Sequence, residues 1–313
     1  MMRGKALAFV PLLLLAWTAD QVAEDRCAHG WSGSTHAFIA ATCLNVSQVP
    51  LASYNARMGS LVPDFFWYLE DTGQLDPASA DQLHGFDALP DLDPETILYQ
   101  TVTSALHPWN IDLSFFAEGI KTHVFADIAV HNLFDGYLEG NGMWVDMLQA
   151  RTGQTNRMAL HLALEFAVDA LLIQDVGSFQ LHDLVRAGPQ AALLENAVNQ
   201  ITLDTNTNLT IQFNRYLSLM RRLEKLAGRW GPYLSGNPAP VDLYDETRAV
   251  LLSDGMPGPL SRELNDYLSA LEILRNYPSE IYQTLTVDMN WQDVLLAVIE
   301  TWNSEAASKT AIK

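Results

Sequence analysis

The chain has little positive charge, which argues against one class of partner. Its 313 residues include 18 lysines and arginines against 37 aspartates and glutamates, so the formal net charge is -19. Residues 1–30 carry three charges of each sign, so the rest of the chain keeps this imbalance. Affinity for nucleic acids depends largely on basic side chains that neutralise phosphates. We therefore expect nucleic acid to be a poor partner, whereas bound cations would neutralise some of the carboxylates.

Long apolar runs are also rare. The run Ala6–Ala16 is shorter than the roughly 18 residues needed to cross a bilayer, and no later run reaches that length. It follows Arg3 and Lys5 and is followed by small residues up to Ala19, which is the pattern of a signal peptide. We predict a signal peptide over residues 1–19 and a secreted or periplasmic protein.

Cysteine is scarce, with only Cys27 and Cys43 in the chain. In an exported protein two cysteines are consistent with one disulfide, and two buried thiols are the alternative. Neither case makes a disulfide-rich scaffold.

Strand-like alternation is nearly absent, and apolar residues instead recur every three or four positions. This spacing predicts helices over Thr35–Leu44, Ala117–Gly136, Arg157–Ile173, Gln190–Arg222, Arg262–Leu274 and Trp291–Trp302. Segments rich in Pro, Gly and Asp predict loops at 73–94, 228–240 and 253–259. Without repeats or a flexible linker, the chain is predicted to be a single all-α domain, a helical bundle.

Two of these helices carry ionisable residues at intervals of four. His123, Asp127 and His131 lie on one stripe of the first helix. Imidazole and carboxylate together suit zinc, and sites rich in nitrogen and oxygen ligands are usually catalytic. The alternative is a hydrogen-bonded ladder of His and Asp in the core.

The second helix favours the metal site. His161, Glu165 and Asp169 repeat the interval among Leu, Ala, Phe and Val. Burying such groups costs several kcal/mol each unless a partner such as a metal neutralises them. For Asp169, and for Asp135 on the first stripe, two roles are equally consistent with the sequence: a metal ligand, or a hydrogen-bond partner that orients an imidazole.

Several motifs follow one another in a specific order: Trp31 with His36 five residues later, Pro63-Asp64, a loop histidine, and the two helical stripes. In this order the chain resembles the zinc-dependent phospholipase C family and the related fungal single-strand zinc nucleases, over roughly residues 31–170. The resemblance implies a helical fold around two or three zinc ions. It also implies that the zincs bind a phosphodiester and activate a water that attacks phosphorus.

The resemblance further implies the ligands. One zinc takes Asp64, the loop histidine, His123 and Asp127; a second takes His131, His161 and Glu165; a third takes His36, Asp127 as a bridge, and the amine and carbonyl of Trp31. The loop histidine is His84 or His107, of which we favour His84. Asp64 is also the candidate proton acceptor. His131 follows Asp127 by four residues rather than six, as in the bacterial branch of the family.

A free amine on Trp31 requires cleavage after Gly30, so we predict a propeptide over residues 20–30 and a catalytic domain over residues 31–313. If Cys27 pairs with Cys43, this propeptide either stays attached after cleavage or is not cut at all. The alternative is that Trp31 is an aromatic residue that merely precedes a helix.

The favoured function is phospholipase C-like hydrolysis of phospholipid headgroups, with peripheral membrane contact. The acidic surface disfavours nucleic acid and suits a cationic choline headgroup. The aromatic run Phe65–Tyr68 either touches the lipid or packs in the core. The alternatives are a single-strand nuclease and a non-catalytic zinc- or lipid-binding helical protein. The sequence does not determine an oligomeric state.

Overall fold

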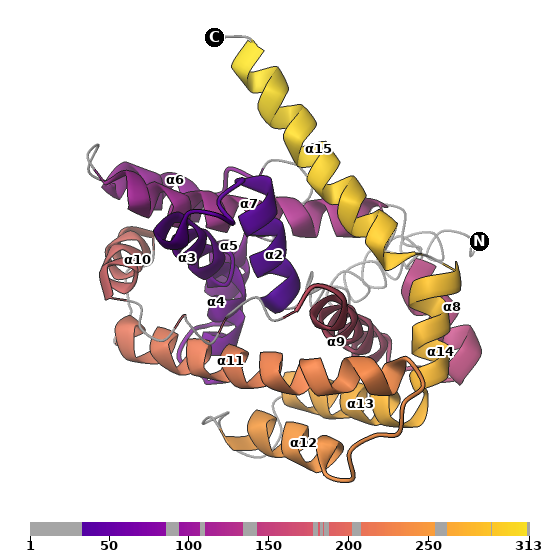
Figure 1. Cartoon of the computed structure of the whole chain (residues 1–313). Coiled ribbons are helices and arrows are strands. Elements are labelled where there is room, and N and C mark those ends of the chain that lie inside the picture. The colour runs from indigo at the N-terminus through magenta and orange to yellow at the C-terminus, as the bar shows by residue number, and fades with distance from the viewer. Residues whose placement is uncertain are drawn as a thin grey trace, which may run out of the picture.

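The computed structural model describes residues 33–85, 94–106, 110–133, 143–177, 181, 184, 188–201, 208–253, 262–288 and 290–311. Within these ranges every regular element is helical, which confirms the predicted all-α class. Figure 1 shows the helices packed against one another, with the C-terminal part of α15 extending away from the other helices. The helices are α2 Gly33–Cys43, α3 Pro50–Gly59, α4 Val62–Asp71, α5 Pro77–His84, α6 Ile97–Ala105, α7 Ile111–Leu133, α8 Met143–Thr152, α9 Arg157–Val176, α10 Gly188–Ile201, α11 Leu209–Leu234, α12 Leu243–Ser253, α13 Arg262–Asn276, α14 Pro278–Gln283 with the π-helical turn Thr284–Asp288, and α15 Trp291–Ala311.

Several predicted boundaries need correction. The helix predicted over Gln190–Arg222 is two helices, because Asn208 caps a new N-terminus by accepting a hydrogen bond from the amide of Ile211. The loop predicted over 73–94 contains α5, which begins after the capping residue Asp76 and ends before Gly85 in the left-handed conformation. The loop predicted from residue 228 is helical as far as Leu234.

Two apolar clusters form the core. One surrounds α9 and α13 and includes Trp230 and Leu274; the other surrounds α4 and α7 and includes Phe65 and Phe213. Helix α9 buries apolar side chains on most of its circumference, as expected of a helix in the middle of a bundle. Glu165 and Asp169 on this helix therefore lie in the interior, and His161 is partly buried.

Helices α3 and α7 approach each other closely at two glycines. A Cβ atom on Gly59 would lie 2.0 Å from the carbonyl oxygen of Phe116, and one on Gly119 would lie 2.2 Å from that of Ala56. Neither distance is sterically tolerable, so glycine is required at both positions. This contact brings the C-terminal end of α3 against the middle of α7, where His123 lies.

None of the helices in the described ranges combines the length and the apolarity that crossing a bilayer demands.

Candidate metal centre

Five ionisable side chains from four helices form one buried cluster. His36 comes from α2, Asp64 from the first turn of α4, His84 from the last residue of α5, and His123 with Asp127 from the middle of α7. Apart from Asp64, whose side chain is 19% exposed, these side chains are at most 5% exposed. His84 was expected in a loop, and the structure places it in a helix instead.

The carboxylate of Asp127 is the centre of this cluster. Its Oδ1 lies 3.4 Å from Nε2 of His36, while its Oδ2 lies 3.1 Å from Nε2 of His123 and 3.6 Å from Nε2 of His84. The two oxygens therefore face different imidazoles. A carboxylate placed in this way can bridge two cations.

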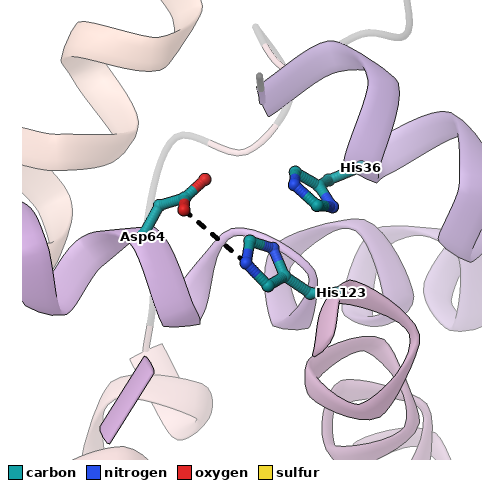
Figure 2. Close-up of side chains that lie close together, drawn as sticks. All are labelled: His36, Asp64 and His123. Carbon is teal, nitrogen blue, oxygen red and sulfur yellow. Dashed lines mark ion pairs between the residues drawn. The ribbon is translucent and has the colours of Figure 1, made fainter. Parts of the chain in front are cut away.

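Asp64 completes one side of the cluster. Its Oδ1 lies 3.3 Å from Nε2 of His84 and 3.6 Å from Nε2 of His123. Figure 2 shows the carboxylate of Asp64 facing His123, with the ring of His36 beside it. The His36 and His123 rings are stacked, with centroids 3.7 Å apart.

Backbone and aromatic contacts fix two of the imidazoles. Nδ1 of His123 lies 2.7 Å from the carbonyl oxygen of Ser60, which can only accept a hydrogen bond, so Nδ1 carries the hydrogen. Nε2 of His123 then points at the carboxylates, as in many metal-binding histidines. Trp67 stacks on the ring of His84 at 3.5 Å between centroids. The sequence could not reveal the role of Ser60, because any residue can offer a carbonyl.

Many polar atoms of the cluster are buried without a hydrogen-bond partner. They are both carboxylate oxygens of Asp127, Oδ1 of Asp64, both ring nitrogens of His36 and Nδ1 of His84. Unpaired buried polar atoms are costly and rare in native proteins. Nitrogen and carboxylate oxygen donors in this arrangement suit a borderline cation such as zinc. The residues present therefore fit a metal centre.

The electrostatics of the cluster fit a lone-pair donor at His36 and an anionic oxygen at Asp127, whereas a cation would have to displace a proton from His123. Burial, together with the nearby His123, lowers the pKa of His36 to about 3. Burial would raise the pKa of Asp127, but the imidazoles of His123 and His36 outweigh it, and the pKa is well below its usual range. Burial also disfavours protonation of His123, yet the carboxylates of Asp127 and Asp64 raise its pKa to about 9.

The second predicted stripe forms a neighbouring pair. Nε2 of His161 lies 2.7 Å from Oε1 of Glu165 on α9. Burial raises the pKa of Glu165 to about 7, although His161 opposes this shift. The backbone of His131 belongs to α7, but its side chain lies outside the described part of the structure, as do Trp31 and His107.

Asp169 has a different role from the predicted one of orienting an imidazole. Its carboxylate accepts hydrogen bonds from the amides of Ser34 and Thr35 and from the hydroxyl of Thr35, at 2.7–3.0 Å. It thus ties the N-terminus of α2 to α9 and compensates the positive end of that helix. Cys43, also on α2, is buried, and its predicted partner Cys27 lies outside the described residues.

This contact leads to a first prediction. We expect Asp169→Asn to lower the free energy of unfolding by about 2 kcal/mol, because an amide nitrogen replaces one acceptor oxygen and the negative charge is lost. Thr35→Val removes only the hydroxyl bond, and we expect a loss of about 1 kcal/mol. Urea denaturation measures both. Equal stability of Asp169→Asn and the wild type would contradict this role.

A cavity lies directly beside the cluster. Four carboxylates, those of Asp64, Glu165, Asp169 and Glu224, belong to its lining, which is otherwise mainly apolar or aromatic and includes Trp67 and Tyr68. Phe65 and Phe66, by contrast, are fully buried core residues. The aromatic run therefore divides between the core and the wall of the cavity.

The comparisons with known proteins agree with this geometry. The sequence model of the family described as zinc dependent phospholipase C matches residues 35–226, which is more than half of the chain. Neither the curated proteins nor the solved structures gave a match to the chain. The matched range contains all five residues of the cluster as well as His161 and Glu165. The chain belongs to the zinc-dependent phospholipase C family.

Proposed function

We propose that this protein is a secreted phospholipase C-like enzyme that uses zinc to hydrolyse the phosphodiester bond of phospholipid headgroups. One observation carries the proposal: buried imidazoles and carboxylates without hydrogen-bond partners lie beside a mainly apolar cavity. A phospholipid has a phosphate that suits the polar cluster and hydrocarbon chains that suit the apolar cavity.

The proposed ligands follow from which atoms face one another. Asp64, His84, His123 and Oδ2 of Asp127 would hold one zinc. His36 and Oδ1 of Asp127 would supply some of the ligands of another zinc. Trp31, which stands two residues before α2 in the sequence, would complete its coordination. His161 and Glu165, with His131, would hold a third. His84 is preferred over His107 because its Nε2 faces two carboxylates.

Bound zinc supplies Lewis acidity and lowers the pKa of a coordinated water. Asp64 is the proposed proton acceptor, because it both faces the imidazoles and lines the cavity, whereas Asp127 is nearly fully buried. The two oxygens of the Asp127 carboxylate would each be available to a cation, because they face different imidazoles. No serine or cysteine nucleophile is required.

The test is a direct comparison of substrates with the zinc-loaded protein. We expect release of phosphocholine from phosphatidylcholine micelles, observed by phosphorus NMR, and little cleavage of single-stranded DNA, observed on a gel. The chelated protein serves as the control for both assays. Cleavage of DNA without release of phosphocholine would favour the nuclease and contradict the proposal.

The proposal includes export and processing. Removal of residues 1–19 and then of 20–30 would give a domain of residues 31–313 whose first amine belongs to Trp31. Mass spectrometry of the protein isolated from the medium or periplasm reads its N-terminal residue directly. An N-terminus other than Trp31 would leave the His36 zinc without its predicted amine ligand.

A further inference from the structure

The cavity beside the metal centre has a wall that the family match does not include. Helices α12 and α13 follow residue 226, where the match ends. They pack on α11 and α9, on the side away from α7 (Figure 1). They contribute six lining residues: Thr247, Leu251, Tyr267, Ala270, Leu271 and Leu274. This wall is thus a property of the present chain that the family match does not explain.

The aliphatic part of this wall offers no polar group to a ligand. Leu251, Ala270, Leu271 and Leu274 are each at most 5% exposed. The hydroxyl hydrogen of Thr247 is already used, since it is donated to the carbonyl of Leu243 at 2.8 Å. A ligand group against these leucines must therefore be hydrocarbon, because buried polar atoms without partners are costly.

Other lining residues do offer polar atoms. The hydroxyls of Ser34 and Tyr216, like Oδ1 of Asp64, are buried without a hydrogen-bond partner. Asp64 belongs to the metal cluster, and it lines the same cavity as Tyr216, together with the carboxylates of Glu165, Asp169 and Glu224. The cavity therefore combines hydrogen-bonding groups near the metal centre with an aliphatic wall. It suits an amphipathic ligand.

We propose that this cavity binds the first carbons of an acyl chain of the phospholipid substrate while the phosphate lies at the metal centre. The inference rests on the proposed function and adds a substrate subsite to it. The cavity volume is about 120 Å³, and an apolar cavity of about 150 Å³ accommodates benzene. The cavity here is somewhat smaller than that, so it has room for a segment of roughly five carbons by the same comparison.

A nucleobase is a poorer occupant. Its ring nitrogens and carbonyl oxygens would face the leucines of α12 and α13 without partners. The net charge of -19 also repels a polyanion. A saturated chain meets neither difficulty.

The test measures kcat/KM for dibutyryl, dihexanoyl and dioctanoyl phosphatidylcholine below their micelle concentrations. Each value is divided by that for bis(4-nitrophenyl) phosphate, which has no acyl chain. For the wild type we expect this ratio to rise about fourfold per added methylene, which is the factor for burying one methylene group. The rise should level off beyond about five carbons, when the cavity is full.

Two variants of α13 change the cavity in opposite directions. Ala270→Leu fills it, and we expect the ratio for the dihexanoyl lipid to fall about tenfold. Leu271→Ala enlarges it, and we expect preference to shift toward the dioctanoyl lipid. Ile273→Ala is the matched control, because Ile273 lies on the same helix and is equally buried but does not line the cavity. We expect it to leave the ratios unchanged.

The outcomes separate this inference from the proposed function. Lipid hydrolysis that is independent of chain length, or unchanged ratios in both cavity variants, would overturn the acyl subsite and leave the phospholipase proposal intact. Hydrolysis of the acyl-free diester without hydrolysis of any phosphatidylcholine would overturn both. If Ala270→Leu does not fold, the opposite shift in Leu271→Ala decides the matter.

Discussion

Asp127→Asn is expected to lose bound zinc and to reduce hydrolysis of phosphatidylcholine on the order of a thousandfold, the scale for removing an electrostatic group from a reaction centre. The reason is the position of Asp127, whose two oxygens face His36 on one side and His123 with His84 on the other. An amide offers one neutral oxygen and an NH2 group that cannot bind a cation. Elemental analysis of the purified variant measures the zinc content, and the substrate assay measures the rate.

A matched carboxylate variant separates metal loss from simple destabilisation. Asp169 is also buried, and its bonds are made to the N-terminus of α2. Asp169→Asn should therefore lower stability yet retain its zinc. Full zinc content and full activity in Asp127→Asn would contradict the assignment of the metal centre.

Removal of zinc by a chelator is expected to lower the melting temperature by roughly 10 °C. A ligand present at a thousand times its Kd stabilises the folded state by about 4 kcal/mol, and each kcal/mol shifts the Tm by about 2–4 °C in a domain of this size. The physical basis is the set of buried oxygens and nitrogens on Asp127, Asp64 and His36 that have no hydrogen-bond partner. Differential scanning calorimetry measures the shift.

The choice of metal and variant provides the controls. Zinc added after chelation should restore the Tm, whereas magnesium should not, because magnesium prefers oxygen ligands in octahedral geometry. In Asp127→Asn the chelator should have a much smaller effect. If chelated and zinc-loaded wild type melt at the same temperature, the cluster is not a metal site.

The sequence alone determined the features that depend on local periodicity. The apolar repeat of three to four positions identified α9 and α13 to within three residues at each end, and it identified most of α7, although it placed the start of α7 six residues too late. It also placed His123 with Asp127, and His161 with Glu165, on common faces, because residues four apart on a helix are neighbours wherever the helix lies. The order of these motifs led to the family that the later comparison showed.

Other features depend on contacts between segments that are distant in the chain, and only the tertiary structure decided them. Helix α5 was missed because a short helix between Pro77 and Gly85 has too few residues for a periodic signal. His84 meets Asp64 and His123 only because α4, α5 and α7 pack together. Packing, which no local pattern encodes, also decides three other features. They are the capping of α2 by Asp169, the contact of the Ser60 carbonyl with His123, and the cavity wall formed by α12 and α13.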